Sequence, residues 1–503
     1  MILAVQEKID LDNVVIDLEA QGLIPEEICI RNCIIPFKAE GSKLYLAVSE
    51  NIDSSIINEI KFLTGKEVKL YKGEREQIIS VVNNCFSKQN AESALKSLKL
   101  EYNNILLDNE PDKKNNLYVH NSPIIRLTTS IIIRAICSEA SDIHIEPFED
   151  SINVRFRIDG VLNEYINLPK KIYPMVCTRI KVMAKMNIAE KRIPQDGKIN
   201  FHYNNSNYDF RVSTLPTVHG EKIVIRILYN KRNKISLTKL GFDTDGIKFI
   251  KNMLNYSHGI ILVTGPTGSG KSTTLYSMIN SLNKLEKNII TIEDPVEFSL
   301  DGINQVNVSN KAGLSFAEGL RSILRQDPDV IMIGEIRDEE TAKIAVRAAI
   351  TGHLVLSTLH TNDSSTSVLR LIDMGIPPYL VCDALIGVVA QRLVRKICPY
   401  CKEEYEADED TLKNMALAPG EKLFRGKGCS KCNGTGYKGR TVIYEYNKID
   451  STKKSIIQNS KNIEEIRKYD FKSGMKNLEE NCRSLVKSGI TTFEEFNRIT
   501  LFI

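Results

Sequence analysis

One short segment limits the possible folds of this chain more than any other. An apolar run, GIILVTG (259–265), passes directly into PTGSGKSTTLYSMINSL (266–282), which has the pattern of a helix. Their junction matches G-x-x-x-x-G-K-[ST] in the strand–loop–helix context that this motif requires. The glycines let backbone N–H groups turn inward toward phosphate oxygens, and the helix N-terminus adds its positive dipole end. The segment therefore predicts a P-loop α/β domain that binds ATP or GTP.

The residues of this loop have distinct expected roles. Lys271 would reach the β- and γ-phosphates, and the Ser272 hydroxyl would ligate Mg²⁺. The residues expected to contact the nucleotide are Gly265, Pro266, Thr267, Gly268, Ser269, Gly270, Lys271, Ser272 and Thr273. Binding of ATP or GTP is the firmest expectation that the sequence supports.

Two further apolar runs end in acidic residues. NIITIEDPVEF (288–298) carries Glu293, Asp294 and Glu297, and DVIMIGEIRD (329–338) reaches Glu335. At the carboxyl ends of P-loop strands, one acid can hold Mg²⁺ or its waters and another can orient the attacking water. In the usual pattern the metal acid directly follows the apolar run, but here Gly334 takes that position. The spacing therefore leaves open which acid has which role, or whether both merely end strands.

A third apolar run contains two histidines. HLVLSTLHT (353–361) begins at His353 and has His360 near its end. A histidine at the tip of a strand beside the γ-phosphate could sense the nucleotide by hydrogen bonding. A structural role for either histidine is the alternative.

Two CxxC pairs lie near the end of the chain. Cys398 and Cys401 form the first pair, Cys429 and Cys432 the second, and 27 residues (402–428) separate them. Four thiolates close a tetrahedral Zn²⁺ shell that leaves no open position for catalysis. The separation is longer than is common for such sites but has room for an extra helix. Structural zinc is therefore expected, with a redox pair or unrelated thiols as alternatives.

The pattern of apolar and polar segments predicts several domains. Residues 1–88 resemble a small α/β domain, expected to dock a partner, and 89–117 a polar linker. Residues 118–235 form a second domain with an amphipathic helix and several strands, and 236–503 a third α/β domain. This third domain includes the cysteine-bearing insert, 396–435, and a helical tail.

Composition excludes several functional classes. The net charge is 67 − 63 = +4 over 503 residues, which gives no support to a dedicated nucleic-acid binder. No apolar run reaches the length of a membrane-spanning helix, and the start, MILAVQEKID, lacks the features of a secretory signal. Eleven cysteines, an odd number, favour a reducing cytosol over a disulfide framework.

In order along the chain, several long segments resemble the secretion ATPase superfamily, and specifically the type IV pilus assembly and type II secretion ATPases. They are SPIIRLTTSIIIRAICSEASDIHIEP (122–147), VRFRIDG (154–160), KRIPQDGKI (191–199), DFRVSTLPTVHGEKIVIRIL (209–228), the P-loop, TIEDPVEF (291–298), LRSILRQDPDVIMIGEIRD (320–338), TGHLVLSTLHTND (351–363) and QRLVRKICPYC (391–401). The resemblance is close over residues 118–445 and looser at the N-terminus. It implies a RecA-like ATPase domain, preceded by a PAS-like α+β domain, in a ring-shaped homo-hexamer.

The resemblance also implies residue roles. Glu297 matches the general base, and Glu335 the acid that organises Mg²⁺ through water. His353 and His360 match the family's histidine pair. The matching arginines are Arg211 and Arg226, which reach the nucleotide on domain closure, and Arg321 and Arg325, which lie near a subunit interface. Lys198 departs from the family, which often has Arg there, and Lys lacks the bidentate fork of Arg.

The expected function is a cytoplasmic ATPase that drives type IV pilin assembly at the inner face of the membrane. The cysteine motif resembles that of the assembly-type ATPases, and retraction-type motors typically lack both this motif and so long an N-terminal region, so the resemblance favours an assembly motor. Expected partners are an inner-membrane platform protein and associated cytoplasmic-face assembly proteins, with no nucleic acid and no membrane span of its own. The R-L-G-type signature of cyclic-di-GMP-binding relatives is absent, so that ligand is not predicted. A type II secretion or DNA-uptake pseudopilus ATPase, a nucleic-acid translocase and a non-hydrolysing scaffold remain alternatives.

Overall fold

The computed structural model describes most of the chain. The residues that it does not describe are 1, 4–6, 12, 50–51, 80, 83–84, 87–90, 92, 98–122, 205, 230–235, 284, 419, 460–462 and 501–503. The expected linker, 89–117, lies largely outside the described residues. The fold divides into two compact units, one of residues 1–230 with 428–435 and the other of residues 231–427 with 436–503.

The first unit begins with a small α/β fold around its own apolar core. Its three-stranded sheet has the order β2-β3-β5, and the helix α3 (Ser54–Thr64) joins the parallel pair β3 and β5. Asp53 accepts a hydrogen bond from the Ser55 N–H at the start of α3, and Gly65, at φ 67°, ends it. The other elements are β1 (Ile2–Leu3), α1 (Leu18–Gln21), α2 (Glu26–Asn32), β2 (Ile34–Glu40), β3 (Lys43–Val48), β4 (Ile52–Asp53) and β5 (Glu67–Lys72).

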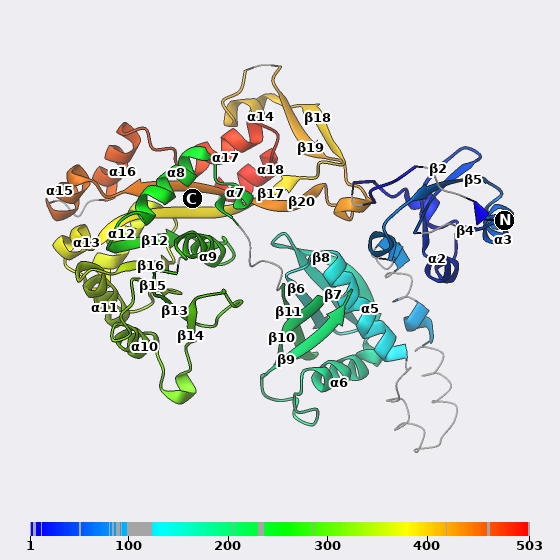
Figure 1. Cartoon of the computed structure of the whole chain (residues 1–503), viewed down its shortest axis with the longest axis horizontal. Coiled ribbons are helices and arrows are strands. Elements are labelled where there is room, and N and C mark those ends of the chain that lie inside the picture. Colours follow the sequence, from blue (N-terminus) through cyan, green and yellow to red (C-terminus); the bar gives the residue numbers. More distant parts are fainter. Residues whose placement is uncertain are drawn as a thin grey trace. The chain divides into compact units, whose positions relative to one another are not determined.

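A six-stranded antiparallel sheet forms the rest of the first unit, with the order β8-β7-β6-β11-β10-β9. Its strands are β6 (Asp142–Pro147), β7 (Ser151–Ile158), β8 (Val161–Pro169), β9 (Gln195–Tyr203), β10 (Ser206–Thr217) and β11 (Gly220–Leu228). The helices α5 (Pro123–Cys137) and α6 (Tyr173–Met183) contribute to one core with Ile143, Phe156 and Ile225 of the sheet (Figure 1). Alternate residues of the strands therefore pack on the helices, and those between them form a polar face.

A buried ion pair ties α6 to the β10–β11 hairpin. The Nζ of Lys181 lies 2.6 Å from the Oε1 of Glu221, and the two side chains are 1% and 5% exposed. Lys181 also donates to the backbone oxygen of Glu190 (2.7 Å), and the Cys177 thiol donates to the other Glu221 oxygen (3.4 Å). Each charge is compensated only by partners inside the protein, so removing one partner leaves the other uncompensated.

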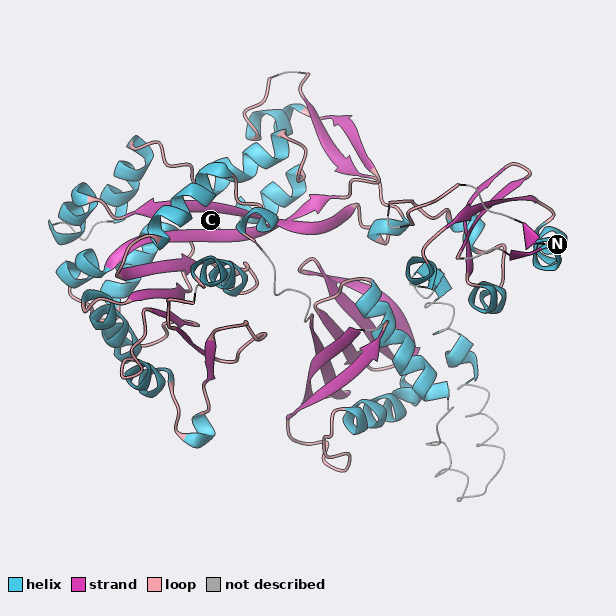
Figure 2. Ribbon diagram, viewed as in Figure 1, coloured by secondary structure: helices cyan, strands magenta, loops and turns pink. Residues whose placement is uncertain are grey.

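The second unit is built on a seven-stranded sheet with helices on both faces (Figure 2). The strand order is β14-β13-β15-β16-β12-β17-β20, and every pair is parallel except β17 with β20. The strands are β12 (Gly259–Thr264), β13 (Ile289–Glu293), β14 (Asn304–Asn307), β15 (Val330–Ile333), β16 (Leu354–Leu359), β17 (Leu385–Ile397) and β20 (Tyr437–Lys448). Along β12, Ile260 and Leu262 join one core, while Ile261 and Val263 join another on the opposite face.

Each face of this sheet has its own set of helices. One core includes residues of α7 (Leu237–Leu240), α8 (Thr244–Leu254) and α9 (Lys271–Leu282). The other includes residues of α10 (Phe316–Ile323), α11 (Glu339–Ile350), α12 (Ser364–Asp373) and α13 (Pro378–Ala384). This three-layer arrangement confirms the predicted P-loop α/β fold. Among the described residues, no helix has the length and apolar content needed to cross a bilayer.

The cysteine-bearing insert and the tail follow the sheet. The insert contains the helix α14 (Glu409–Asn414), for which the sequence left room, and an unforeseen antiparallel pair, β18 (Lys402–Glu406) with β19 (Lys422–Gly426). The tail is helical, as predicted. Its helices are α15 (Ser451–Asn459), α16 (Ile463–Lys472), α17 (Leu478–Lys487) and α18 (Phe493–Thr500).

We expect Lys181→Met to destabilise the six-stranded sheet by about 3–5 kcal/mol, because it leaves the Glu221 carboxylate buried and unpaired. Hydrogen exchange of the β11 amides would measure this loss. The double variant Lys181→Met/Glu221→Leu should regain most of the protection. Arg192→Ala, which removes an exposed pair with Glu190, is the control and should leave exchange unchanged. Equal protection in Lys181→Met and Arg192→Ala would contradict the expectation.

Candidate nucleotide and zinc sites

The P-loop connects the strand β12, which lies between β16 and β17, to the helix α9. Its turn uses Gly265, Gly268 and Gly270 at φ values of 141°, 80° and 88°. A Cβ on Gly265 would lie 2.3 Å from the backbone oxygen of Gln391, so no larger residue fits there. The glycine spacing of the motif is thus explained by the close approach of the neighbouring strand β17.

Gln391 supports the loop through hydrogen bonds of its side chain, a role that the sequence analysis did not predict. Its Nε2 donates to the backbone oxygen of Ser269 (2.8 Å), and its Oε1 accepts from the hydroxyl of Thr274 (2.8 Å). The side chain is 1% exposed. The available signal was a polar residue inside the otherwise apolar run of β17, since buried amides require partners.

Lys271 is the first residue of α9, and its side chain lies within the loop. The Nζ donates to the backbone oxygens of Gly265 (2.8 Å) and Pro266 (3.0 Å). Burial lowers the Lys271 pKa to about 8, although the charge of Glu335 acts in the opposite direction. Ser272 is exposed, so its hydroxyl is accessible to a metal ion. Loop and residues fit the nucleotide and Mg²⁺ expected from the motif.

Charged residues meet at the carboxyl ends of β13, β15 and β16. The Nε2 of His360 lies 3.2 Å from one oxygen of Glu335, and Arg337 bonds the other oxygen. Arg337 also lies 3.4 Å from Asp294. Burial would raise the Glu335 pKa, but the bond and charge of Arg337, together with His360, bring it below its ordinary value. Glu335 is therefore an ionised carboxylate at the edge of the sheet that carries the P-loop.

The three acids around the turn after β13 differ in environment. Glu293 is buried and bonded to Tyr276, to Thr291 (2.7 Å) and to Gln305 (3.1 Å). Burial raises the Glu293 pKa, while these hydrogen bonds oppose the shift. Asp294 is exposed and Glu297 is half-buried. Glu297 therefore keeps the access to a water molecule that Glu293 lacks.

Within one chain, the structure places His353 away from this cluster, at the other end of β16 from His360. The six residues of β16 lie between them, so His353 is at the amino end of the strand and His360 just beyond its carboxyl end. The Nδ1 of His353 lies 2.9 Å from the backbone oxygen of Ala348, at the end of α11. At about 3.3 Å per residue, the six residues of β16 span about 20 Å.

Arg321 and Arg325 lie on the exposed surface at α10. Arg321 bonds Glu318 (2.9 Å) and Glu340 (2.5 Å). Arg325 donates to the backbone oxygen of Arg321 (3.0 Å). Their exposure is compatible with an interface role, and the residues that they bond here belong to α10 and α11.

Arg211 and Arg226 belong to the first unit. They are directly opposite each other in β10 and β11, and Lys198 of β9 is opposite Arg211. All three lie on the polar face of the sheet. Arg226 is 60% exposed and bonds Asp142 at 3.0 Å. The alternation predicted from the sequence therefore produces a row of cations across three strands.

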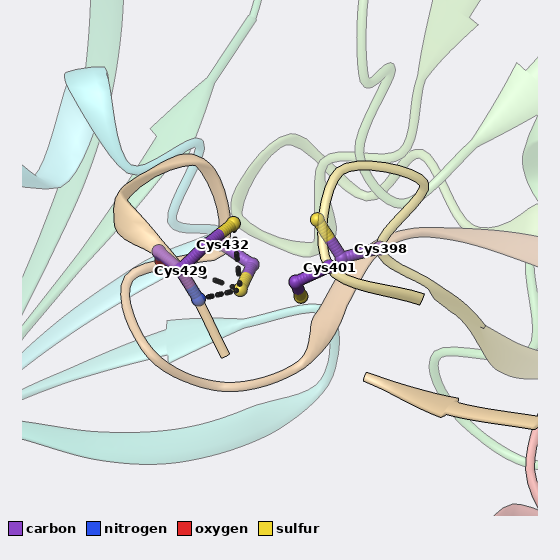
Figure 3. A group of neighbouring side chains, drawn as sticks. All are labelled: Cys398, Cys401, Cys429 and Cys432. Atoms are coloured by element: carbon purple, nitrogen blue, oxygen red, sulfur yellow. Dashed lines mark hydrogen bonds between the residues drawn. The ribbon is translucent and has the colours of Figure 1, made fainter. Parts of the chain in front are cut away.

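The four predicted cysteines come together (Figure 3). Their sulfur atoms all lie within 4.8 Å of one another, and those of Cys429 and Cys432 are 3.7 Å apart. Zn–S bonds of about 2.3 Å in a tetrahedron give S–S distances of about 3.8 Å. Backbone bonds from Cys398 to Gly436 (2.9 Å) and from Lys427 to Cys401 (3.0 Å) hold the two turns beside each other. The thiols fit structural zinc and leave no position for a reactant.

Comparison with known proteins identifies the family. The model of the type II/IV secretion system protein family matches residues 118–498. The chain belongs to this family of secretion and pilus ATPases. A second model, the MshEN domain, matches residues 3–92.

Curated relatives of this ATPase come from two kinds of system. A type II secretion system protein E of Pseudomonas aeruginosa is 48% identical over 75% of this chain and 76% of its own length. The type II secretion system ATPase E of Vibrio cholerae is 46% identical over 80% of this chain and 78% of its own length. The type IV pilus assembly ATPase PilB of Myxococcus xanthus is 40% identical over 94% and 85%.

Solved structures agree with the ATPase fold. The pilus retraction motor PilT with bound ADP has a TM-score of 0.50 and 28% identity, covering 73% of this chain and 95% of PilT. The ATPase DotB of Legionella pneumophila has a TM-score of 0.57 at 21% identity, covering 74% and 95%, and shows the fold alone. The family, the P-loop and the likeness to PilT together support hydrolysis of ATP.

We expect the purified ATPase to contain one zinc ion per chain and Cys398→Ser to lose it, because three thiolates leave the shell open. Elemental analysis of the protein after dialysis would measure the ratio. Cys137→Ser changes a half-buried cysteine outside the cluster and should retain the metal. Equal zinc in both variants would exclude this site.

Proposed function

We propose that this chain is the motor that hydrolyses ATP to drive assembly of type IV pilin filaments at the inner membrane. The extent of the alignments supports a pilus over a secretion system. The Myxococcus xanthus pilus ATPase matches 94% of the chain, whereas the type II secretion relatives from Pseudomonas aeruginosa and Vibrio cholerae match 75% and 80%. Similarity to the pilus ATPase thus extends over the N-terminal region as well.

A type II secretion or DNA-uptake pseudopilus is the second candidate. The Pseudomonas aeruginosa relative is more identical within its shorter match, 48% against 40%. The residues of the ATP site serve either system equally, because both would use the same hydrolysis. The polymer that is assembled therefore distinguishes the candidates, and the chemistry does not.

In the proposed mechanism, the loop N–H groups and Lys271 bind the phosphates. Ser272 and, through water, Glu335 would hold Mg²⁺, which would neutralise phosphate charge. Glu297 orients and deprotonates the attacking water, and His360 senses the nucleotide through Glu335. Arg211 and Arg226 stabilise the γ-phosphoryl charge on closure, which ties hydrolysis to domain movement.

The proposed assembly is a homo-hexamer on the cytoplasmic face of the membrane. Residues 1–88 would dock an inner-membrane platform protein or its associated assembly proteins, and Arg321 and Arg325 would line an interface between subunits. The domain bounds given by the sequence, with a second domain at 118–235 and an ATPase domain at 236–503, are part of this proposal.

We expect Glu297→Gln to reduce ATP turnover at least about 100-fold, since general-base catalysis contributes about 10²–10⁴. ATP binding should persist, because the loop and Lys271 are unchanged. Phosphate release and equilibrium nucleotide binding would be measured on the full chain. Asp301→Asn, at an exposed acid outside the charged cluster, is the control and should leave turnover unchanged. Unchanged turnover in Glu297→Gln would remove it from the base role.

We expect cells that carry only Lys271→Ala to lack surface pili, because the phosphates lose their cation. Electron microscopy would count filaments, and a type II exoenzyme assay on the same cells would follow secretion. Lost pili with normal secretion supports the pilus assignment, and the reverse supports the pseudopilus. Normal pili together with normal secretion in the variant would contradict an ATP-driven motor. Stimulation of turnover by DNA, but not by a platform protein, would favour a translocase.

A further inference from the structure

Tyr276 connects the helix that follows the P-loop to the turn that carries Glu297. It lies on α9, five residues after Lys271, and is 2% exposed. Its hydroxyl donates to the buried carboxylate of Glu293 and accepts a bond from the backbone N–H of Glu297 (3.3 Å). One phenol thus uses both its donor and an acceptor, on two residues of the same segment.

The rest of this segment is held through the same carboxylate. Glu293 accepts a bond from the Nε2 of Gln305 (3.1 Å), and the Oε1 of Gln305 accepts from the N–H of Leu300 (2.7 Å). The ring of Phe298 packs edge-on against Tyr276, with centroids 4.7 Å apart and planes at 89°. Both sides of Glu297 are therefore fixed to a network whose centre is Glu293.

We propose that Tyr276, paired with Glu293, is a positioning residue for Glu297. It fixes the position of the Glu297 backbone relative to the sheet. It also links that position to the helix that begins at the P-loop. This inference rests on the proposed role of Glu297 as base. It assigns no contact with ATP to Tyr276 or Glu293, because both are buried beneath the turn.

The burial of Glu293 explains why Tyr276 and Glu293 hold Glu297 firmly in place. A carboxylate in a site of low polarity forms stronger hydrogen bonds than one in water, and bonds in a chain polarise each other. The donors are Thr291, on the same strand, Tyr276 and Gln305. Three donors leave the carboxylate little freedom to move, and Tyr276 transmits this constraint to the N–H of Glu297.

Tyr276→Phe tests the proposal, because it keeps the ring and removes only the hydroxyl. We expect kcat for ATP hydrolysis by the full chain to fall about 10–100-fold, since small displacements of a catalytic group cost up to about 100-fold. KM and the Kd for ATP should change less than about twofold, because the phosphate loop is intact. Tyr444→Phe is the matched control: Tyr444 is 4% exposed, and its hydroxyl bonds Asp243 at 2.5 Å.

The control separates positioning from general stability. Both variants remove the hydroxyl of a buried tyrosine that bonds a carboxylate, so both should lower Tm, but only Tyr276→Phe should lower kcat. A second variant, Gln305→Ala, cuts the other support of the turn and should also lower kcat selectively. The proposal is overturned if both Tyr276→Phe and Gln305→Ala keep the wild-type kcat while Glu297→Gln loses it. If Glu297→Gln itself keeps the wild-type kcat, the base role fails first, and this inference fails with it.

Discussion

The parallel register of the seven-stranded sheet determines where the chemistry occurs. Ile292, Ile333, Ser357, Leu262 and Val388 are paired in one continuous row across β13, β15, β16, β12 and β17. One to three residues beyond this row, each strand delivers a polar group to the same edge. These groups are Glu293, Glu335, His360, the P-loop from Gly265, and Gln391. Shifting one strand by one residue would turn its group to the other face.

Sequence patterns predicted the groups that stand at strand ends. The P-loop, Glu335 and His360 were found because each follows an apolar run, and the cysteines because their spacing is distinctive. His353 and His360 flank one strand, whose two ends face opposite edges of the sheet, so only His360 lies beside Glu335. Two residues that are close in sequence become neighbours in space when a turn lies between them, but not when an extended strand does.

The supporting residues could not be predicted in this way. Tyr276 and Gln391 lie inside a helix and a strand, where the sequence shows only a polar atom in an apolar context. Their roles depend on which strands are neighbours, and that is a property of the sheet order.

Charged and polar contacts, as well as apolar packing, hold the C-terminal helices to the rest of the second unit. Buried Glu445 of β20 accepts bonds from the N–H and hydroxyl of Ser364 (2.7 and 2.8 Å), at the start of α12. The preceding residue, Asp363, caps α12 and pairs with Arg467 of α16 at 2.6 Å.

Only two residues separate His360 from Asp363. The tail therefore fixes the position of the segment that follows β16 and carries this histidine. Burial raises the Glu445 pKa, while the bonds from Ser364 oppose the shift. A carboxyl group in this environment is tolerated only if its hydrogen-bond donors are present, because burying a carboxyl without hydrogen bonds costs folding free energy. The position of His360 beside Glu335 is therefore set from two sides: by the register of β16 within the sheet, and by the helices that follow 100 residues later in the chain.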